Sequence, residues 1–111
     1  MAHKMIGDYF KRRESDIKRM IKMHLEGKGC LVIDYRSVGI MKPNGSYIPM
    51  SKRGVSDLLG LTREGKFFAI EVKTEAGRLS QEQKRFIEVV KSHGCKAFVA
   101  KSVEDVIKEG L

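Results

Sequence analysis

The stretch SDLLGLTREGKFFAIEVKTEAGRLSQEQ, residues 56–83, contains the two runs of this chain that are most typical of β-strands. Residues 55–61 and 66–73 are rich in apolar and β-branched side chains, and the TREG sequence between them ends in Gly65, as in a turn. We therefore predict a β-hairpin. It is unusual because Asp57, Glu71 and Lys73 stand where Val or Ile would be expected.

The strand over residues 66–73 is predicted to lie centrally in a sheet. Because side chains alternate along a strand, Glu71 and Lys73 share a face with Phe67 and Ala69, and the opposite face is apolar. A charge buried there without a partner costs several kcal/mol. One interpretation is a Glu71–Lys73 ion pair at an exposed strand end, where such pairs are nearly neutral in energy.

The other interpretation is a metal site, because the hairpin can bring Asp57 close to Glu71. Hard cations such as Mg²⁺ take one or two carboxylates and complete their shell with water and phosphate. Lys73 would then orient or activate water, or neutralise charge on phosphoryl oxygens. Helical spacing places Glu14 on the inward stripe as a further acid, although a first-turn acid is also favoured by the helix dipole alone.

The flanking segments predict a mixed sheet with helices packed on it. Ile17, Ile21 and Leu25 form the apolar stripe of a first helix that begins at Glu14 and is ended by Gly27. Residues 30–36 are predicted to form a strand. Residues 37–54 have no clear period, which is typical of a functional loop or an irregular hairpin.

The C-terminal third predicts a helix, a strand and a short helix. Ser80 and Gln83 form a capping-box pattern at the start of a helix whose apolar face is formed by Phe86, Val89 and Val90. A strand over residues 95–100 and a helix over residues 103–109 follow. A strand that crosses through a helix to the next strand implies parallel pairing, whereas the hairpin is antiparallel.

Length and charge fit one basic domain. The chain has 111 residues and a formal net charge of +8, which favours a polyanionic partner such as nucleic acid. The sequence shows neither a long apolar run nor a leader pattern, so we expect a protein of the cytoplasm, with no membrane partner. The two Cys and three His residues show no zinc-ligand spacing.

The quoted stretch and its surroundings resemble a known family. RGVSDLLG, followed by GKFFAIEVKTEAGRLSQEQKRFIEVVKSHG, resembles the VRR-NUC branch of the PD-(D/E)XK nuclease superfamily, and its stand-alone, phage-type members in particular. The likeness extends over about residues 14–105. It implies an α/β restriction-endonuclease-like core in one nuclease domain, residues 14–111, after a basic arm formed by residues 1–13. Ser56 departs from the motif, which nominally has proline before the aspartate.

The resemblance implies metal-dependent phosphodiester hydrolysis. Asp57, Glu71 and the Val72 carbonyl would bind Mg²⁺ or Mn²⁺, with Glu14 as the helix-borne acid near the metal. Lys73 would be the catalytic lysine. The resemblance also places Gln83 beside the site, although the capping box explains that residue without catalysis.

The substrate expected from the resemblance and the charge is DNA. Basic residues flank the acids in sequence and would hold phosphates without reading bases, although each is also typical of a solvated surface: Lys52, Arg53, Arg78, Lys84 and Arg85. Branched or flapped DNA is expected because no base-reading motif is apparent, and the resemblance implies a homodimer similar to Holliday-junction resolvases. Two other hypotheses remain, a non-catalytic basic DNA-binding module and a basic interaction protein, and RNA is open as a substrate.

Overall fold

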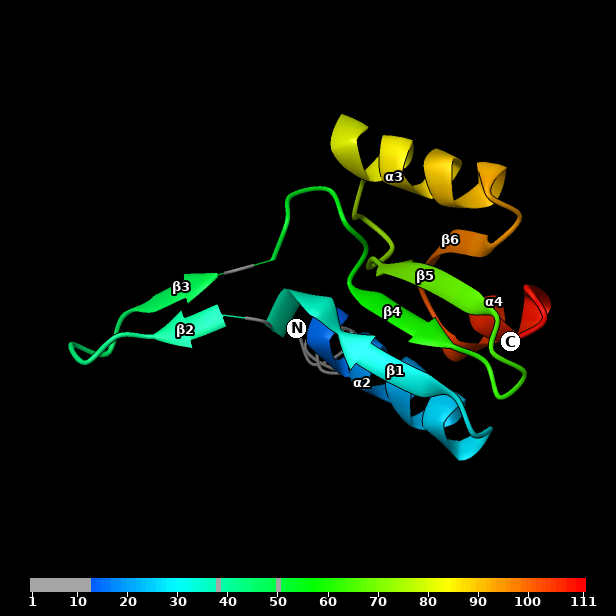
Figure 1. Cartoon of the computed structure of the whole chain (residues 1–111), viewed down its shortest axis with the longest axis horizontal. Helices are drawn as coiled ribbons and strands as arrows, with labels where there is room; N and C mark the ends of the chain where they lie inside the picture. Colours follow the sequence, from blue (N-terminus) through cyan, green and yellow to red (C-terminus); the bar gives the residue numbers. More distant parts are fainter. Residues whose placement is uncertain (1–12, 38, 50) are drawn as a thin grey trace, which may run out of the picture.

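The computed structural model describes residues 13–37, 39–49 and 51–111 (Figure 1). The helices are α2 (Glu14–Gly27), the 3₁₀ turn η1 (Tyr35–Ser37), α3 (Gln81–Ser92) and α4 (Val103–Lys108). The strands are β1 (Leu31–Asp34), β2 (Gly39–Met41), β3 (Tyr47–Pro49), β4 (Leu58–Leu61), β5 (Phe67–Val72) and β6 (Lys96–Ala100). Residues 1–12, nearly all of the predicted basic arm, lie outside the described residues.

Four strands form the main sheet, in the order β1–β4–β5–β6. The β1–β4 and β4–β5 pairs are antiparallel, and β5–β6 is parallel, with α3 as the connection between its two strands. The predicted mixed sheet is therefore confirmed, and β5 is one of its two central strands. The β4–β5 turn contains Gly65, whose φ of 88° favours glycine.

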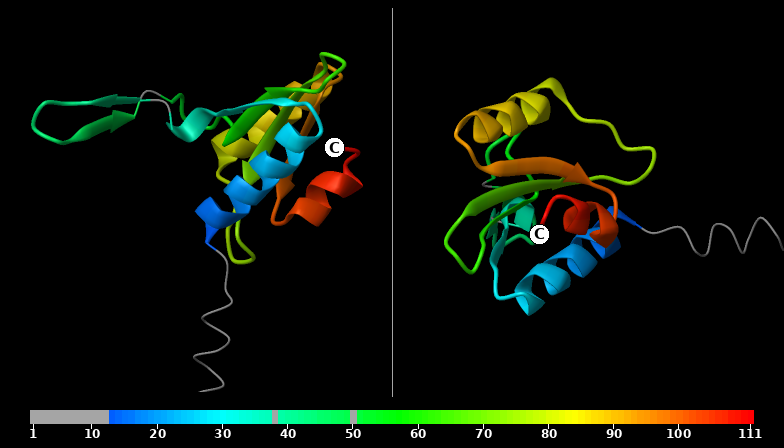
Figure 2. Two further views of the ribbon diagram at one scale, coloured as in Figure 1. Left: turned by 90° about the horizontal axis from the view of Figure 1, so that it is seen from below. Right: turned by 90° about the vertical axis from the view of Figure 1, so that its right-hand side faces the viewer.

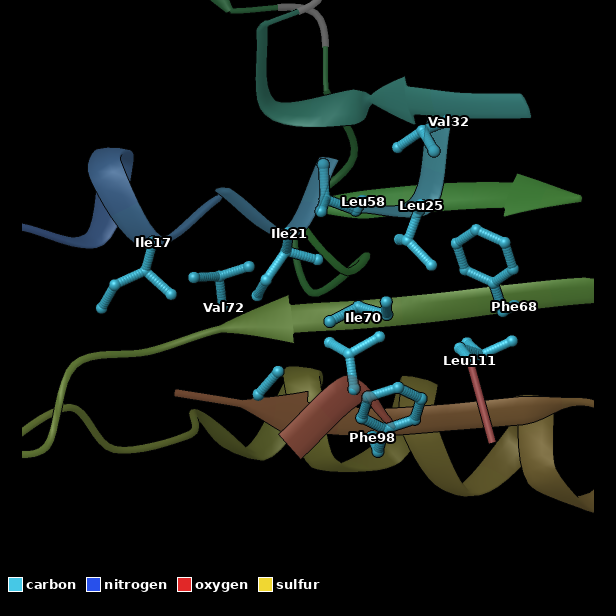
Figure 3. Close-up of a cluster of buried hydrophobic side chains, with 12 residues drawn as sticks. Ile17, Ile21, Leu25, Val32, Leu58, Phe68, Ile70, Val72, Phe98 and Leu111 are labelled. Carbon is cyan, nitrogen blue, oxygen red and sulfur yellow. The ribbon is translucent and has the colours of Figure 1, made fainter. Parts of the chain in front are cut away.

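Helices cover the sheet on both faces (Figure 2). On one face, the buried side chains of α2 and α4 pack against alternate residues of the strands (Figure 3). On the other face, Ile87 and Val90 of α3 pack against Ala69 and Ala97. The alternation of β5 is as predicted, because Phe68, Ile70 and Val72 all face the α2 side.

Two local predictions for the elements around the sheet need correction. The strand predicted over residues 30–36 ends at Asp34, and the chain then turns into η1, which contains Arg36. In α3 the buried stripe is Gln83, Ile87 and Val90, whereas Val89, predicted to be on the apolar face, is 48% exposed. The buried face of α3 therefore includes the polar residue Gln83 and does not include the apolar residue Val89.

The long segment over residues 37–54 contains a hairpin. Of the two predicted alternatives, a functional loop and an irregular hairpin, the structure has the hairpin. Strands β2 and β3 pair with each other and extend away from the main sheet (Figure 1). At its base, the Tyr47 hydroxyl donates a hydrogen bond to the Ser37 carbonyl, and the Lys52 amide donates one to the Tyr35 hydroxyl. The longest described helix has 14 residues, and none of the described helices could serve as a transmembrane segment.

Candidate active site

Asp57 and Glu71 come together at one end of the β4–β5 pair. Leu58 pairs with Ile70, so continuing the antiparallel register puts Asp57 opposite Glu71, on the same face. Both residues are buried, with exposed fractions of 4% and 1%. The Val72 amide donates a 2.8 Å hydrogen bond to Asp57 Oδ2, which fixes the orientation of this carboxylate.

The carboxylate of Glu71 is held by two side chains through one of its oxygens. Gln83 Nε2, from the first turn of α3, donates a 3.1 Å hydrogen bond to Glu71 Oε2. Lys73 Nζ forms an ion pair with the same oxygen at 3.6 Å. The predicted Glu71–Lys73 pair therefore forms, but Glu71 is fully buried, not solvated as in the simple ion-pair interpretation.

The capping box of α3 aims Gln83 at the site. The Ser80 hydroxyl accepts a hydrogen bond from the Gln83 amide, and Gln83 Oε1 accepts one from the Ser80 amide. The Gln83 side-chain amide is thereby oriented so that its Nε2 reaches Glu71. Helix capping and contact with the acid are thus two functions of the one Gln83 side chain, and the first does not exclude the second.

Arg36 is a member of the cluster that sequence analysis did not identify. From η1, its Nε lies 3.6 Å from Asp57 Oδ1, and its Nη2 lies 3.7 Å from Glu71 Oε1. Its side chain is 39% exposed, so it closes the site on the solvent side. The only signal in the sequence was a basic residue at the end of the run over residues 30–36, which the strand prediction placed in the sheet.

The environment favours the protonated form of Glu71. Burial raises its pKa, and the neighbouring Asp57 carboxyl group raises it further, to about 8. The charges of Arg36 and Lys73 act in the opposite direction but are outweighed. Glu71 Oε1 is also buried with no hydrogen-bond partner among the described residues. Two acids are therefore held together although the protein does not fully compensate their charge.

This arrangement fits a divalent cation. A buried carboxylate oxygen that accepts no hydrogen bond from any described residue, next to a second carboxylate, forms a hard donor pair of the kind that Mg²⁺ and Mn²⁺ bind. The described residues contain no cluster of three or more acidic, His or Cys side chains at metal-binding distance. The fit therefore depends on water and substrate phosphate as additional ligands, which is usual for Mg²⁺.

The structure does not bring Glu14 into this cluster. It is the first residue of α2, and its side chain is exposed, so the prediction that it points inward is wrong. The apolar stripe of the helix enters the core only at Ile17. Residues 13 and 14 precede the part of α2 that packs on the sheet. At these two positions the helical phase therefore does not determine which side chains are buried. Val72, the other predicted ligand, is the last residue of β5.

The predicted DNA-binding residues lie on the surface near the same end of the sheet. All five are exposed: Lys52, Arg53, Arg78, Lys84 and Arg85. The loop before β4 packs closely on the start of α3: a side chain at Gly54 would place its Cβ only 2.7 Å from the Cβ of Glu82. Hydrogen bonding to backbone amides, followed by the charge of Arg53, lowers the pKa of Glu82. The two basic segments, separated in sequence, therefore meet at the first turn of α3.

Comparisons with known proteins agree with the geometry. The family model of the VRR-NUC domain matches residues 47–104, just over half of the chain. A solved structure described as a VRR_NUC domain is similar to this fold, with a TM-score of 0.63 and 25% sequence identity over 86% of this chain and 90% of that chain. A comparison with curated proteins gave no match. The matched residues include Asp57, Glu71, Lys73 and Gln83 but neither Glu14 nor Arg36.

Proposed function

Because the chain belongs to the VRR-NUC domain family, which is a family of nucleases, we propose that it is a metal-dependent, structure-selective DNA endonuclease. The observation that carries this proposal is the buried pair Asp57 and Glu71, with Lys73 at the same strand end. Two buried acids whose mutual repulsion is only partly compensated by Arg36 and Lys73 are costly for stability, and a bound cation is the natural further compensation.

The chain's own residues have separable roles in this proposal. Asp57 and Glu71, with the Val72 carbonyl, would hold Mg²⁺ or Mn²⁺. The ion would polarise the phosphate and favour deprotonation of water. Lys73 has a side chain only 15% exposed, so its ammonium group is largely shielded from bulk water and can stabilise charge on phosphoryl oxygens or orient the attacking water.

The exposed basic residues around α3 and the loop before β4 are proposed to bind the DNA backbone. Their charge supports binding to phosphates on both sides of the acidic pair. Phosphate contacts of this kind position a duplex without reading its bases, which supports selection of branched or flapped DNA by shape. Family likeness supports the more specific proposal of a homodimer that cleaves Holliday junctions.

The test is a cleavage assay on matched DNA substrates. The purified protein is incubated with junction, flap, nicked, single-stranded and linear duplex DNA, and with RNA, in Mg²⁺, in Mn²⁺ and in EDTA. We expect metal-dependent cleavage, at least tenfold faster on junctions or flaps than on linear duplex. Cleavage in EDTA would contradict metal dependence, and equal rates on all DNA substrates would contradict structure selectivity.

A matched pair of variants assigns the activity to this site. Asp57→Asn should abolish cleavage, whereas Asp34→Asn should not. Asp34 is on the neighbouring strand β1 and pairs with Lys18 of α2 at 3.1 Å, outside the acidic pair. Binding of DNA that falls steeply with salt, with no cleavage and no metal-dependent heat in calorimetry, would instead support a non-catalytic DNA-binding module.

The dual role of Gln83 predicts that two variants of the capping box will differ in activity. Ser80→Ala and Gln83→Ala each break the box, so each should lower the free energy of unfolding by about 1 kcal/mol. Only Gln83→Ala also removes the hydrogen bond to Glu71, and it should lower the cleavage rate roughly 10–100-fold, as for other residues that orient a metal ligand.

Denaturant unfolding and cleavage rates measured in parallel check this prediction for Gln83. If both variants lose activity equally, the cap accounts for the effect and Gln83 does not act through Glu71.

A further inference from the structure

The two acids of the site each have one oxygen bound to the protein and one that faces a cation. Asp57 Oδ2 accepts the hydrogen bond from the Val72 amide, and Glu71 Oε2 accepts that from Gln83. The remaining oxygens, Asp57 Oδ1 and Glu71 Oε1, both face the guanidinium of Arg36. The Arg36 guanidinium therefore lies beside both of the oxygens that are available to a metal ion.

Arg36 is close to both oxygens without binding either tightly. Its distances of 3.6 and 3.7 Å exceed the roughly 2.7–2.9 Å of a charge-assisted hydrogen bond. Within the described part of the chain, the buried Glu71 Oε1 accordingly has no hydrogen-bond partner. The guanidinium thus supplies positive charge to the pair while the coordination of both oxygens remains incomplete.

Arg36 also has freedom to move away. Its side chain is 39% exposed, in contrast to the buried acids, and it belongs to the three-residue turn η1, not to a strand of the sheet. Leaving the acids would therefore bring the guanidinium into water at little packing cost. Lys73, by comparison, follows β5 directly and has a side chain only 15% exposed.

We propose that Arg36 is the counter-ion of the metal-free site and that it is exchanged for the divalent cation when the metal binds. The inference rests on the proposed function, because it needs a metal at Asp57 and Glu71. A guanidinium that remained beside both free oxygens would repel a divalent ion there, so the two cations compete for one position. Arg36 thereby stabilises the metal-free protein and weakens its metal affinity.

The experiment is calorimetric titration of Mn²⁺ and of Mg²⁺ into the metal-free full chain, at one pH and ionic strength. Arg36→Ala and the more conservative Arg36→Gln remove the charge, whereas Arg36→Lys keeps it. Arg63→Ala is the matched control. Arg63 is exposed in the β4–β5 turn, at the opposite end of β5 from Glu71, and about 15 Å of strand separates the two positions.

Both neutral variants should bind Mn²⁺ about tenfold more tightly than the wild type, and Arg36→Lys should stay within about threefold of it. Arg63→Ala should be unchanged. The metal-free melting temperature should fall in Arg36→Ala and Arg36→Gln, and Mn²⁺ should raise it by more than in the wild type. This second readout does not depend on cleavage.

The outcomes separate this inference from the proposed function. Unchanged or weaker affinity in Arg36→Gln, with clear binding by the wild type, overturns the exchange and leaves the nuclease proposal intact. Absence of binding in the wild type and in every variant overturns both. Binding that appears only after the Arg36 charge is removed supports the exchange. If Arg36→Ala does not fold, Arg36→Gln and Arg36→Lys decide the question.

Discussion

Glu71→Gln should abolish metal-dependent cleavage and, at the same time, stabilise the metal-free protein at pH 9. Cleavage is lost because an uncharged amide is a poor ligand for a hard divalent cation. Stability is gained because the wild-type carboxylate is buried beside Asp57, and one of its oxygens has no hydrogen-bond partner among the residues that the structure describes. The amide oxygen of glutamine can still accept the hydrogen bond from Gln83.

The pH dependence follows from the pKa of Glu71, which is raised from 4.5 to about 8 in the folded chain. Between these values the folded protein binds a proton that the unfolded chain has lost. The free energy of unfolding of the metal-free wild type should therefore fall as pH rises from about 5 to about 8, and then level off. In Glu71→Gln this contribution disappears, so the two proteins should be similar at pH 5.

Denaturant unfolding in EDTA at pH 5, 7 and 9 measures the difference. Since each pKa unit corresponds to about 1.4 kcal/mol, we expect a gain of a few kcal/mol at pH 9. Glu88→Gln, an exposed change of the same type on α3, should alter neither stability nor cleavage. A Glu71→Gln protein that is less stable than the wild type at pH 9 would show that the site is electrostatically compensated without a metal.

Lys73→Ala should reduce cleavage roughly 10³-fold while metal binding and DNA binding persist. The ammonium group lies 3.6 Å from Glu71 Oε2, beside the proposed metal ligands, and a protonated amine cannot itself bind a metal ion. Its loss should therefore lower kcat far more than it changes KM or the affinity for Mn²⁺. Single-turnover cleavage and calorimetry measure these quantities separately.

Lys101→Ala is the matched control for Lys73. The Lys73 amide bonds to the Ala100 carbonyl, so Lys101 follows the neighbouring strand at the same end of the sheet. Its Nζ reaches the Glu75 carbonyl and neither acid. Lys101→Ala should keep cleavage within about threefold of the wild type, on the scale of an exposed charge. Equal losses of cleavage in the two variants would mean that Lys73 contributes only general positive charge at this end of the sheet and has no specific role in the reaction.

The parts of the site that the sequence predicts correctly depend on local rules. Alternation along β5 puts Glu71 on the face opposite Phe68 and Ile70, and a short turn fixes the register that brings Asp57 opposite Glu71. The capping box is equally local, because Ser80 and Gln83 are three residues apart. Such patterns need no knowledge of how the distant elements pack.

The errors arise where tertiary structure overrides a local pattern. Arg36 was missed because the strand-like sequence continues past Asp34, whereas the backbone turns into η1 and directs the arginine to the acids. Glu14 shares the phase of the buried stripe but lies beyond the sheet that would cover it. In α3, burial of Gln83 beside Glu71 shifts the covered face toward Ile87 and exposes Val89.

The β2–β3 hairpin lies in the segment between Arg36 and Asp57, and the two ends of this segment are in direct contact. The Tyr35 amide donates a 2.9 Å hydrogen bond to the Asp57 carbonyl, and Arg36 pairs with the Asp57 side chain, so the chain is fastened on both sides of the insertion. Changes in the length or sequence of the β2–β3 hairpin should therefore leave the acidic pair in place. The hairpin can therefore vary in length and sequence, in evolution or by design, while the geometry of the acidic pair stays the same.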